Sequence, residues 1–150
     1  MNIYIDADGC PVVKETIKVA KQFGVPVVIV CDAAHYFMHD GVQTITVMQG
    51  SDAVDYEIIN RLQPGDLVIT QDYGLGALVL AKKGYAMNQN GKRYEDQNID
   101  QLLFTRHLSS KLRQSGQRLK GPKKRTREDT QQFILALTNF LKSIQEGQSH

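Results

Sequence analysis

Long apolar runs and cysteines are scarce in this sequence. No apolar run approaches the ~18 residues that a membrane-spanning helix needs, so we expect no membrane contact. The N-terminus lacks the basic and apolar segments of a signal peptide. Two cysteines, Cys10 and Cys31, are too few for a disulfide scaffold and suit a reducing compartment. We therefore expect a soluble protein of the cytoplasm.

Nothing in the composition departs from that of a globular protein. The 150 residues are 41% hydrophobic and 23% charged, which excludes wholesale disorder, collagen and coiled-coil arrays. A chain of this length matches the commonest domain size of ~100–150 residues. We predict one domain over residues 1–144 and a disordered tail over residues 145–150.

Acidic residues are absent from residues 101–127, which hold nine Lys and Arg. Residues 1–100 instead hold 8 Lys and Arg against 13 Asp and Glu. A basic segment beside an acidic body indicates a polyanionic partner such as RNA or DNA, although a solvated loop would show the same charges. Aromatic side chains for stacking on bases are sparse there, so we expect contacts with the phosphate backbone. The best candidates for these contacts are Lys120, Lys123, Lys124, Arg125 and Arg127.

Apolar β-prone runs alternate along the chain with segments of helical spacing. Strands are expected at residues 3–5, 25–31, 43–47 and 66–70, with a small hairpin formed by residues 85–87 and 92–94. Helices are expected at residues 11–23, 52–62, 75–83, 99–114 and 127–142, the last opened by a capping box between Thr126 and Asp129. This alternation predicts a three-layer α/β/α sandwich with a mainly parallel sheet.

Carboxylates follow three of the predicted strands. Asp6 and Asp8 come after the first strand, Asp72 comes after the fourth, and Asp52 and Asp55 begin the helix after the third. Ligands in such folds collect beyond the carboxyl ends of the strands, so these acids are expected to gather at one edge of the sheet. Their mutual repulsion would be offset by a hard cation, Mg²⁺ or Mn²⁺. Capping would equally explain Asp52 and Asp55, and a turn would explain Asp72.

The residues Asp6-Ala7-Asp8-Gly9 also resemble the start of haloacid-dehalogenase-type phosphatases, in which the first Asp is a covalent nucleophile. The later acidic motif of those phosphatases has no counterpart here, because Gly65-Asp66 precedes its strand instead of following one. The resemblance therefore covers only these four residues. A small-molecule phosphatase is the weakest of the functional alternatives.

A resemblance to a bacterial family covers residue 1 to about Lys142. The chain resembles the YaiI/YqxD family, which is grouped with PIN-like domains, in four segments: Asp6 to Val12, Gly50 to Asp55, Ile69 to Leu75 and Gly121 to Lys123. Membership implies a PIN-like fold related to metal-dependent nucleases. In those nucleases, acids at the positions of Asp6, of Asp52 or Asp55, and of Asp72 bind Mg²⁺ or Mn²⁺, and Asp8 is an extra acid of this family.

The residues and the resemblance together predict a metal-dependent nuclease acting on phosphodiester bonds of RNA or DNA. The expected catalytic residues are Asp6, Asp8, Asp55 and Asp72, and Asp52 joins them as an expected metal ligand. The main alternative is a nucleic-acid-binding module whose acidic site has lost turnover. The sequence does not choose between RNA and DNA, and it leaves homodimer formation open.

Overall fold

A six-stranded sheet forms the centre of the computed structural model, which describes residues 1–32, 39, 41–50, 52–100 and 124–148. The strands lie in the order β3-β2-β1-β4-β5-β6, and only the β5–β6 pair is antiparallel. Their bounds are Ile3–Asp6 (β1), Val27–Asp32 (β2), Gln43–Val47 (β3), Leu67–Ile69 (β4), Tyr85–Met87 (β5) and Arg93–Tyr94 (β6). The predicted mainly parallel sheet and terminal hairpin are confirmed.

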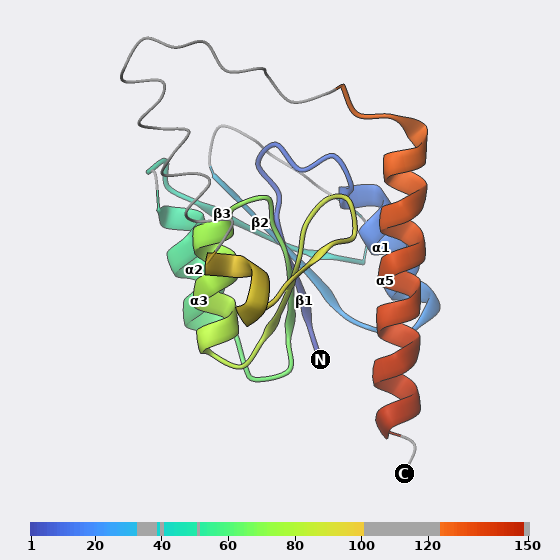
Figure 1. Ribbon diagram of the computed structural model, residues 1–150. Coiled ribbons are helices and arrows are strands. Elements are labelled where there is room, and N and C mark those ends of the chain that lie inside the picture. Colours follow the sequence, from blue (N-terminus) through green and yellow to red (C-terminus); the bar gives the residue numbers. More distant parts are fainter. Residues whose placement is uncertain (33–38, 40, 51, 101–123, 149–150) are drawn as a thin grey trace, which may run out of the picture.

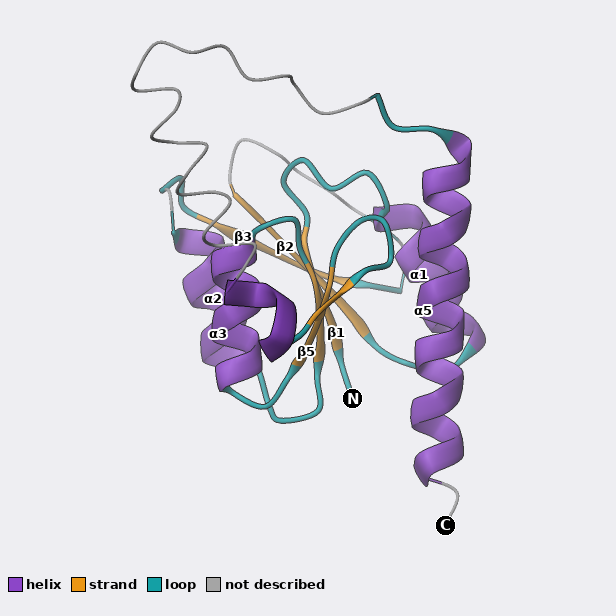
Figure 2. Cartoon of the chain, in the orientation of Figure 1, coloured by secondary structure: helices purple, strands orange, loops and turns teal. Residues whose placement is uncertain are grey.

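Helices cover both faces of this sheet (Figure 2). Helices α1 (Val13–Gln22) and α5 (Arg127–Gln148) pack together on one face. Helices α2 (Ala53–Arg61) and α3 (Tyr73–Ala81) cover the other face (Figure 1). The predicted α/β/α sandwich is therefore confirmed.

Strand β1 separates two hydrophobic clusters and contributes to both of them. Ile3 and Ile5 are fully buried in the cluster under α1 and α5, whereas Tyr4 is buried in the cluster under α2 and α3. A parallel strand that is covered on both faces needs apolar side chains on both, which explains its unbroken apolar run. Asp6 ends this strand and is its first acidic residue.

The order of the strands reverses direction at β1. Strand β2 pairs with one side of β1 and β4 pairs with the other, so the loops after β1 and β4 leave the sheet next to each other. Open α/β sheets bind ligands at this kind of switch point, beyond the carboxyl ends of the strands. The topology thus brings the predicted acids of these two loops together.

The ends of the helices differ from the predicted ones at two places. Helix α3 begins at Tyr73 instead of Leu75, because the Asp72 carboxylate caps it by accepting hydrogen bonds from the Gly74 and Leu75 amides. Helix α5 continues to Gln148, so the prediction of a disordered tail is wrong for residues 145–148, where Gln145 donates a hydrogen bond to the Phe23 carbonyl at 2.7 Å.

The predicted capping box at the start of α5 is confirmed. The Thr126 amide donates to Asp129 Oδ2 at 2.8 Å, and the Asp129 amide donates to Thr126 Oγ1 at 3.2 Å. The helix expected at residues 99–114 begins earlier, since residues 96–100 are helical, and residues 101–114 lie outside the described part. None of the helices in the described ranges is long and apolar enough to cross a membrane.

Candidate functional site

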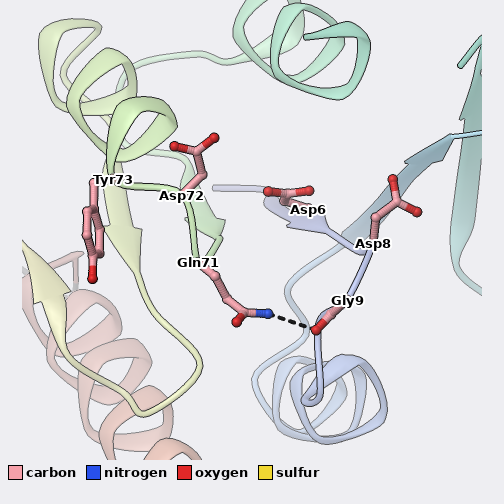
Figure 3. Close-up of a pocket in the computed structure, with 6 residues that line it drawn as sticks. All are labelled: Asp6, Asp8, Gly9, Gln71, Asp72 and Tyr73. Atoms are coloured by element: carbon pink, nitrogen blue, oxygen red, sulfur yellow. Dashed lines mark hydrogen bonds between the residues drawn. The ribbon is translucent and has the colours of Figure 1, made fainter. Parts of the chain in front are cut away.

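Asp6 lies at the centre of the candidate site. It ends β1, beside the loop that carries Asp72 (Figure 3). Burial raises the pKa of the Asp6 carboxyl above its ordinary value of 3.8, and the charges of Asp72 and Asp8 add to this effect. A half-buried carboxylate with like-charged neighbours is disfavoured in its charged form, so this site is suited to a compensating cation.

Thr70 holds the Asp6 carboxylate in position. The Thr70 hydroxyl donates to Asp6 Oδ2 at 2.7 Å and accepts from the Asp72 amide at 3.0 Å. The Thr70 carbonyl in turn accepts from the Tyr94 hydroxyl at 3.1 Å. Both Thr70 and Tyr94 are buried, so this chain of hydrogen bonds fixes the relative positions of the first strand and the loop after the fourth.

Asp8 and Asp72 also have structural tasks. Asp8 Oδ2 accepts from the Asp32 amide at 3.0 Å, which ties the loop after β1 to the end of β2. Asp72 Oδ1 accepts from the Gly74 amide at 2.8 Å as the cap of α3. These bonds hold each carboxylate in a defined orientation.

A pocket of about 610 Å³ opens between the loops after β1 and β4. Its lining contains Asp6, Asp8 and Asp72, with Asp6 between the other two in the view of Figure 3. Gln71 closes one side, because its side-chain amide donates to the Gly9 carbonyl at 2.8 Å and so joins the two loops (Figure 3). The predicted acids of the two loops therefore share one pocket.

Asp52 and Asp55 belong to a third segment, at the start of α2. Burial, together with the charges of Asp72, Asp6 and Asp52, raises the pKa of the Asp55 carboxyl to about 6. Asp55 thus interacts electrostatically with both loops. Asp52 is exposed, precedes the helix without forming a side-chain cap, and lines a separate groove with Asp55. The capping explanation of Asp52 is not supported by any hydrogen bond of its side chain to the helix.

The chemistry of these donors fits a hard divalent cation. Within the residues that the structure describes, no three His, Cys, Asp or Glu side chains stand close enough to hold a metal ion between them. Mg²⁺ nevertheless needs only one or two carboxylates, since it keeps several of its waters. Three carboxylates line this pocket, and the charge of Asp72 lies close enough to Asp6 to raise the pKa of its carboxyl.

The thiol of Cys10 is not suited to act as a nucleophile here. Burial, together with the charges of Asp6 and Glu15, raises its pKa to about 11. The thiol is therefore protonated at neutral pH, and a protonated thiol is a poor nucleophile. Its side chain packs against the core under α1 and α5.

The end of the basic segment reaches the site's edge of the sheet (Figure 1). Of the five predicted phosphate-binding residues, Lys124, Arg125 and Arg127 are described, whereas Lys120 and Lys123 lie outside the described residues. Lys124 and Arg127 are exposed. The charge of Arg125 lies close enough to Cys10 to lower the pKa of its thiol.

Arg125 has a structural role that sequence reasoning missed. Its guanidinium donates to the Gln89 carbonyl and to Asn90 Oδ1, both at 2.7 Å, and to Thr130 Oγ1 at 3.2 Å. It therefore joins the β5–β6 turn to the first turn of α5. Such tight, partly buried bonds restrict Arg125, whereas Lys124 and Arg127 are exposed.

Sequence reasoning also missed Thr70, Gln71 and Tyr94. Thr70 stands two residues before Asp72, which places both on the loop that leaves the fourth strand. That spacing was a usable signal for Thr70. Nothing local indicates that Tyr94, from the terminal hairpin, bonds to the carbonyl of Thr70.

The raised pKa of Asp55 predicts a change of stability with pH. Without divalent cations, the contribution of the Asp55 carboxyl to the free energy of unfolding should fall as the pH rises from 3.8 to about 6. The reason is that this carboxyl loses its proton at a lower pH in the unfolded state than in the folded state. The free energy of unfolding of Asp55→Asn, relative to that of the original chain, should therefore increase as the pH rises across this range. Urea unfolding at several pH values measures the difference. Glu57→Gln, on the same helix but paired with Arg61, is the control. A difference that does not vary with pH would contradict the prediction.

Comparisons with known proteins agree on one family. The model of the YaiI/YqxD family, described as uncharacterized, matches residues 4–143. A UPF0178 protein of Exiguobacterium sibiricum is 53% identical over 141 residues, which cover 94% of this chain and 96% of the relative. One of Ruminiclostridium cellulolyticum is 46% identical over 98% of this chain and 96% of its own. No solved structure matches the chain. The chain therefore belongs to the YaiI/YqxD family.

Proposed function

We propose that the pocket of Asp6, Asp8 and Asp72, together with Asp55, binds Mg²⁺ or Mn²⁺ and hydrolyses phosphodiester bonds of RNA or DNA. The observation that carries this proposal is that Asp6, Asp8 and Asp72 line one pocket between two loops, with Asp55 of a third segment within reach of their charges. The charges of Asp72 and Asp6 both raise the pKa of Asp55, and that of Asp72 raises the pKa of Asp6. The resemblance to PIN-like nucleases assigns the same positions to metal binding.

Asp6 and Asp72 are the carboxylates that would hold the cation, with Asp8 beside them. A cation bound there would polarise a phosphoryl oxygen and lower the pKa of a water molecule. The Thr70 hydroxyl keeps the Asp6 carboxylate from turning away, since it holds Oδ2 at 2.7 Å. The Asp72 carboxylate is held in the same way by the amides of α3.

Asp55 is suited to exchange a proton near neutral pH. Without a bound cation its pKa is about 6, close to the pH at which general acids and bases work best. Asp55 lies on α2, outside the two pocket loops, so it would approach a bound substrate from a different side than Asp6 and Asp72. The exposed Lys124 and Arg127 offer cations to the phosphates of a bound strand.

Cleavage of labelled single-stranded RNA and DNA tests this proposal, with Mn²⁺, Mg²⁺ or EDTA present. We expect cleavage that requires a divalent cation and that is lost in the double variant Asp6→Asn, Asp72→Asn. Asn retains the ability to cap a helix, so α3 keeps its N-terminal hydrogen bonds in the variant. Cleavage that persists in the double variant would come from a contaminant and would contradict the proposal.

A binding module without turnover is the second candidate. The observation that favours it is that Asp8 and Asp72 both serve the fold through hydrogen bonds, so their presence does not require a reaction. It predicts binding that weakens as salt rises, with no cleavage in any divalent cation. A phosphatase would instead form an aspartyl-phosphate at Asp6, which mass spectrometry would detect.

A further inference from the structure

A second groove lies between α2 and α3. It measures about 320 Å³ and is lined by Asp52, Asp55, Tyr56, Ile59 and Leu78. The first four follow one another at helical spacing along α2 and the residue before it, and Leu78 comes from α3. The groove thus combines two carboxylates at one end with aromatic and aliphatic side chains.

Tyr56 is the one exposed aromatic side chain among the residues that the structure describes. It is 68% exposed, and Leu78 opposite it is 50% exposed. The other described aromatic side chains are buried or half-buried. An exposed ring beside aliphatic side chains in a concave surface is a platform on which a flat apolar group can stack.

The polar groups of this groove select what can occupy it. Asp52 and Asp55 carry only hydrogen-bond acceptors when ionised, so they repel phosphate and attract donors. An unpaired nucleobase with an exocyclic amino group offers such donors along its edge and a face that stacks on tyrosine. A base fits this combination, whereas the sugar-phosphate backbone does not.

The groove and the proposed catalytic pocket have no lining residue in common, and Asp55 is the link between them. This residue lines the groove, and the charges of Asp72 and Asp6 reach its carboxyl. A strand with one phosphate at the pocket would therefore have a neighbouring base within reach of the groove.

We propose that the groove between α2 and α3 is a subsite for one unpaired, amino-bearing nucleobase of the bound strand, with Tyr56 as its stacking platform. The subsite rests on the proposed function, because it needs a nucleic-acid strand. It adds to that function a preference for single strands and for adenine, cytosine or guanine over uracil or thymine at this position.

A single tryptophan reports on this subsite directly, since the chain contains none. In Tyr56→Trp, a short single-stranded oligoadenylate should quench the tryptophan fluorescence saturably, because a stacked base contacts the indole. Ca²⁺, another cation that prefers oxygen ligands, replaces Mg²⁺ in the buffer to limit cleavage. An abasic strand with the same number of phosphates should leave the fluorescence unchanged. The control is Leu135→Trp, at a 61% exposed position of α5 on the other face of the sheet.

Affinity measured by anisotropy of a labelled strand completes the test. Tyr56→Ala should weaken binding of oligoadenylate about 10-fold, as expected for the loss of one stacked base, whereas Tyr56→Phe should retain it. Oligouridylate should bind the original chain more weakly than oligoadenylate does. The two strands should bind Tyr56→Ala equally weakly.

The outcomes separate the subsite from the proposed function. Binding of the strand to Tyr56→Trp without quenching of the indole, or equal quenching by the abasic strand, would overturn the subsite and leave the function standing. Protection of the introduced indole from acrylamide in the free protein would show that another part of the chain covers the groove, which would also overturn the subsite. Absence of any strand binding would overturn both.

Discussion

Asp6→Asn is expected to abolish metal-dependent cleavage while making the metal-free protein more stable. The loss of activity should be at least roughly 100-fold, the range found when a group that stabilises charge in the transition state is removed. The gain in stability follows from the raised pKa of the Asp6 carboxyl, because a raised pKa means that the folded state disfavours its charge at neutral pH. Asn keeps an oxygen that can accept the Thr70 hydroxyl.

Two measurements on the same variant check this prediction. Thermal unfolding in EDTA should give a higher Tm for Asp6→Asn than for the original chain, and added Mg²⁺ or Mn²⁺ should raise the Tm of the original chain only. Glu57→Gln removes a carboxylate that pairs with Arg61 outside the pocket, and it should leave both cleavage and the metal response unchanged. A variant that loses stability in EDTA would show that the Asp6 carboxylate serves the fold instead of the site.

Phe133→Ala is expected to lower the free energy of unfolding by roughly 3–5 kcal/mol, the range for removing a large buried aromatic side chain. Phe133 is fully buried and belongs to the cluster between the sheet and helices α1 and α5. The loss would take much of the roughly 5–15 kcal/mol that stabilises a typical domain. Urea unfolding at fixed pH measures it.

Leu135→Ala is the matched control for this prediction, because Leu135 lies two residues further along α5 and is 61% exposed. Its effect should stay within about 0.5 kcal/mol. Equal effects of the two variants would mean that α5 does not pack on the sheet as described. Gly91 also lies close to α5, since a Cβ at this position would lie 2.6 Å from that of Ala136. A side chain at residue 91 would therefore disturb the same packing.

The opposite signs of the stability changes expected at Asp6 and Phe133 follow from the different chemistry of the two side chains. Phe133 is buried without a polar group to satisfy, so its burial stabilises the fold. Asp6 is a half-buried carboxyl beside two other acids, so its charge opposes the fold unless a cation compensates. A residue that the fold retains against its own stability is a candidate for function.

Local patterns in the sequence predicted most of the fold. Several signals depend only on neighbouring residues. They are the unbroken apolar runs at residues 3–5 and 25–31, the helix end at Gly24 and the turn that ends at Gly91. Gly24 and Gly91 have φ angles of +68° and +85°, which other residues rarely adopt, so these stops can be predicted without knowledge of the rest of the chain. The capping box of Thr126 and Asp129 is local in the same sense.

The sequence also predicted which acids could meet, because parallel strands bring their carboxyl ends to one edge. It did not separate Asp55 from Asp52. Helical spacing makes the two neighbours on one face, and only the packing of α2 on the sheet decides that the Asp72 and Asp6 charges bear on Asp55. It also did not predict that α5 extends past residue 142, because the Gln145 side chain bonds to Phe23, a residue 122 positions away.

What the sequence by itself determined is the order and type of the elements, the edge at which the acids collect and the family. What only the tertiary structure decided is the use of each polar atom: Thr70 holding Asp6, Asp8 accepting from Asp32, and Arg125 joining the β5–β6 turn to α5. The physical reason is the separation along the sequence of the residues that interact. Backbone conformation follows from neighbouring residues, whereas the partner of a side-chain oxygen depends on the register of strands that meet across 24 to 64 residues of chain.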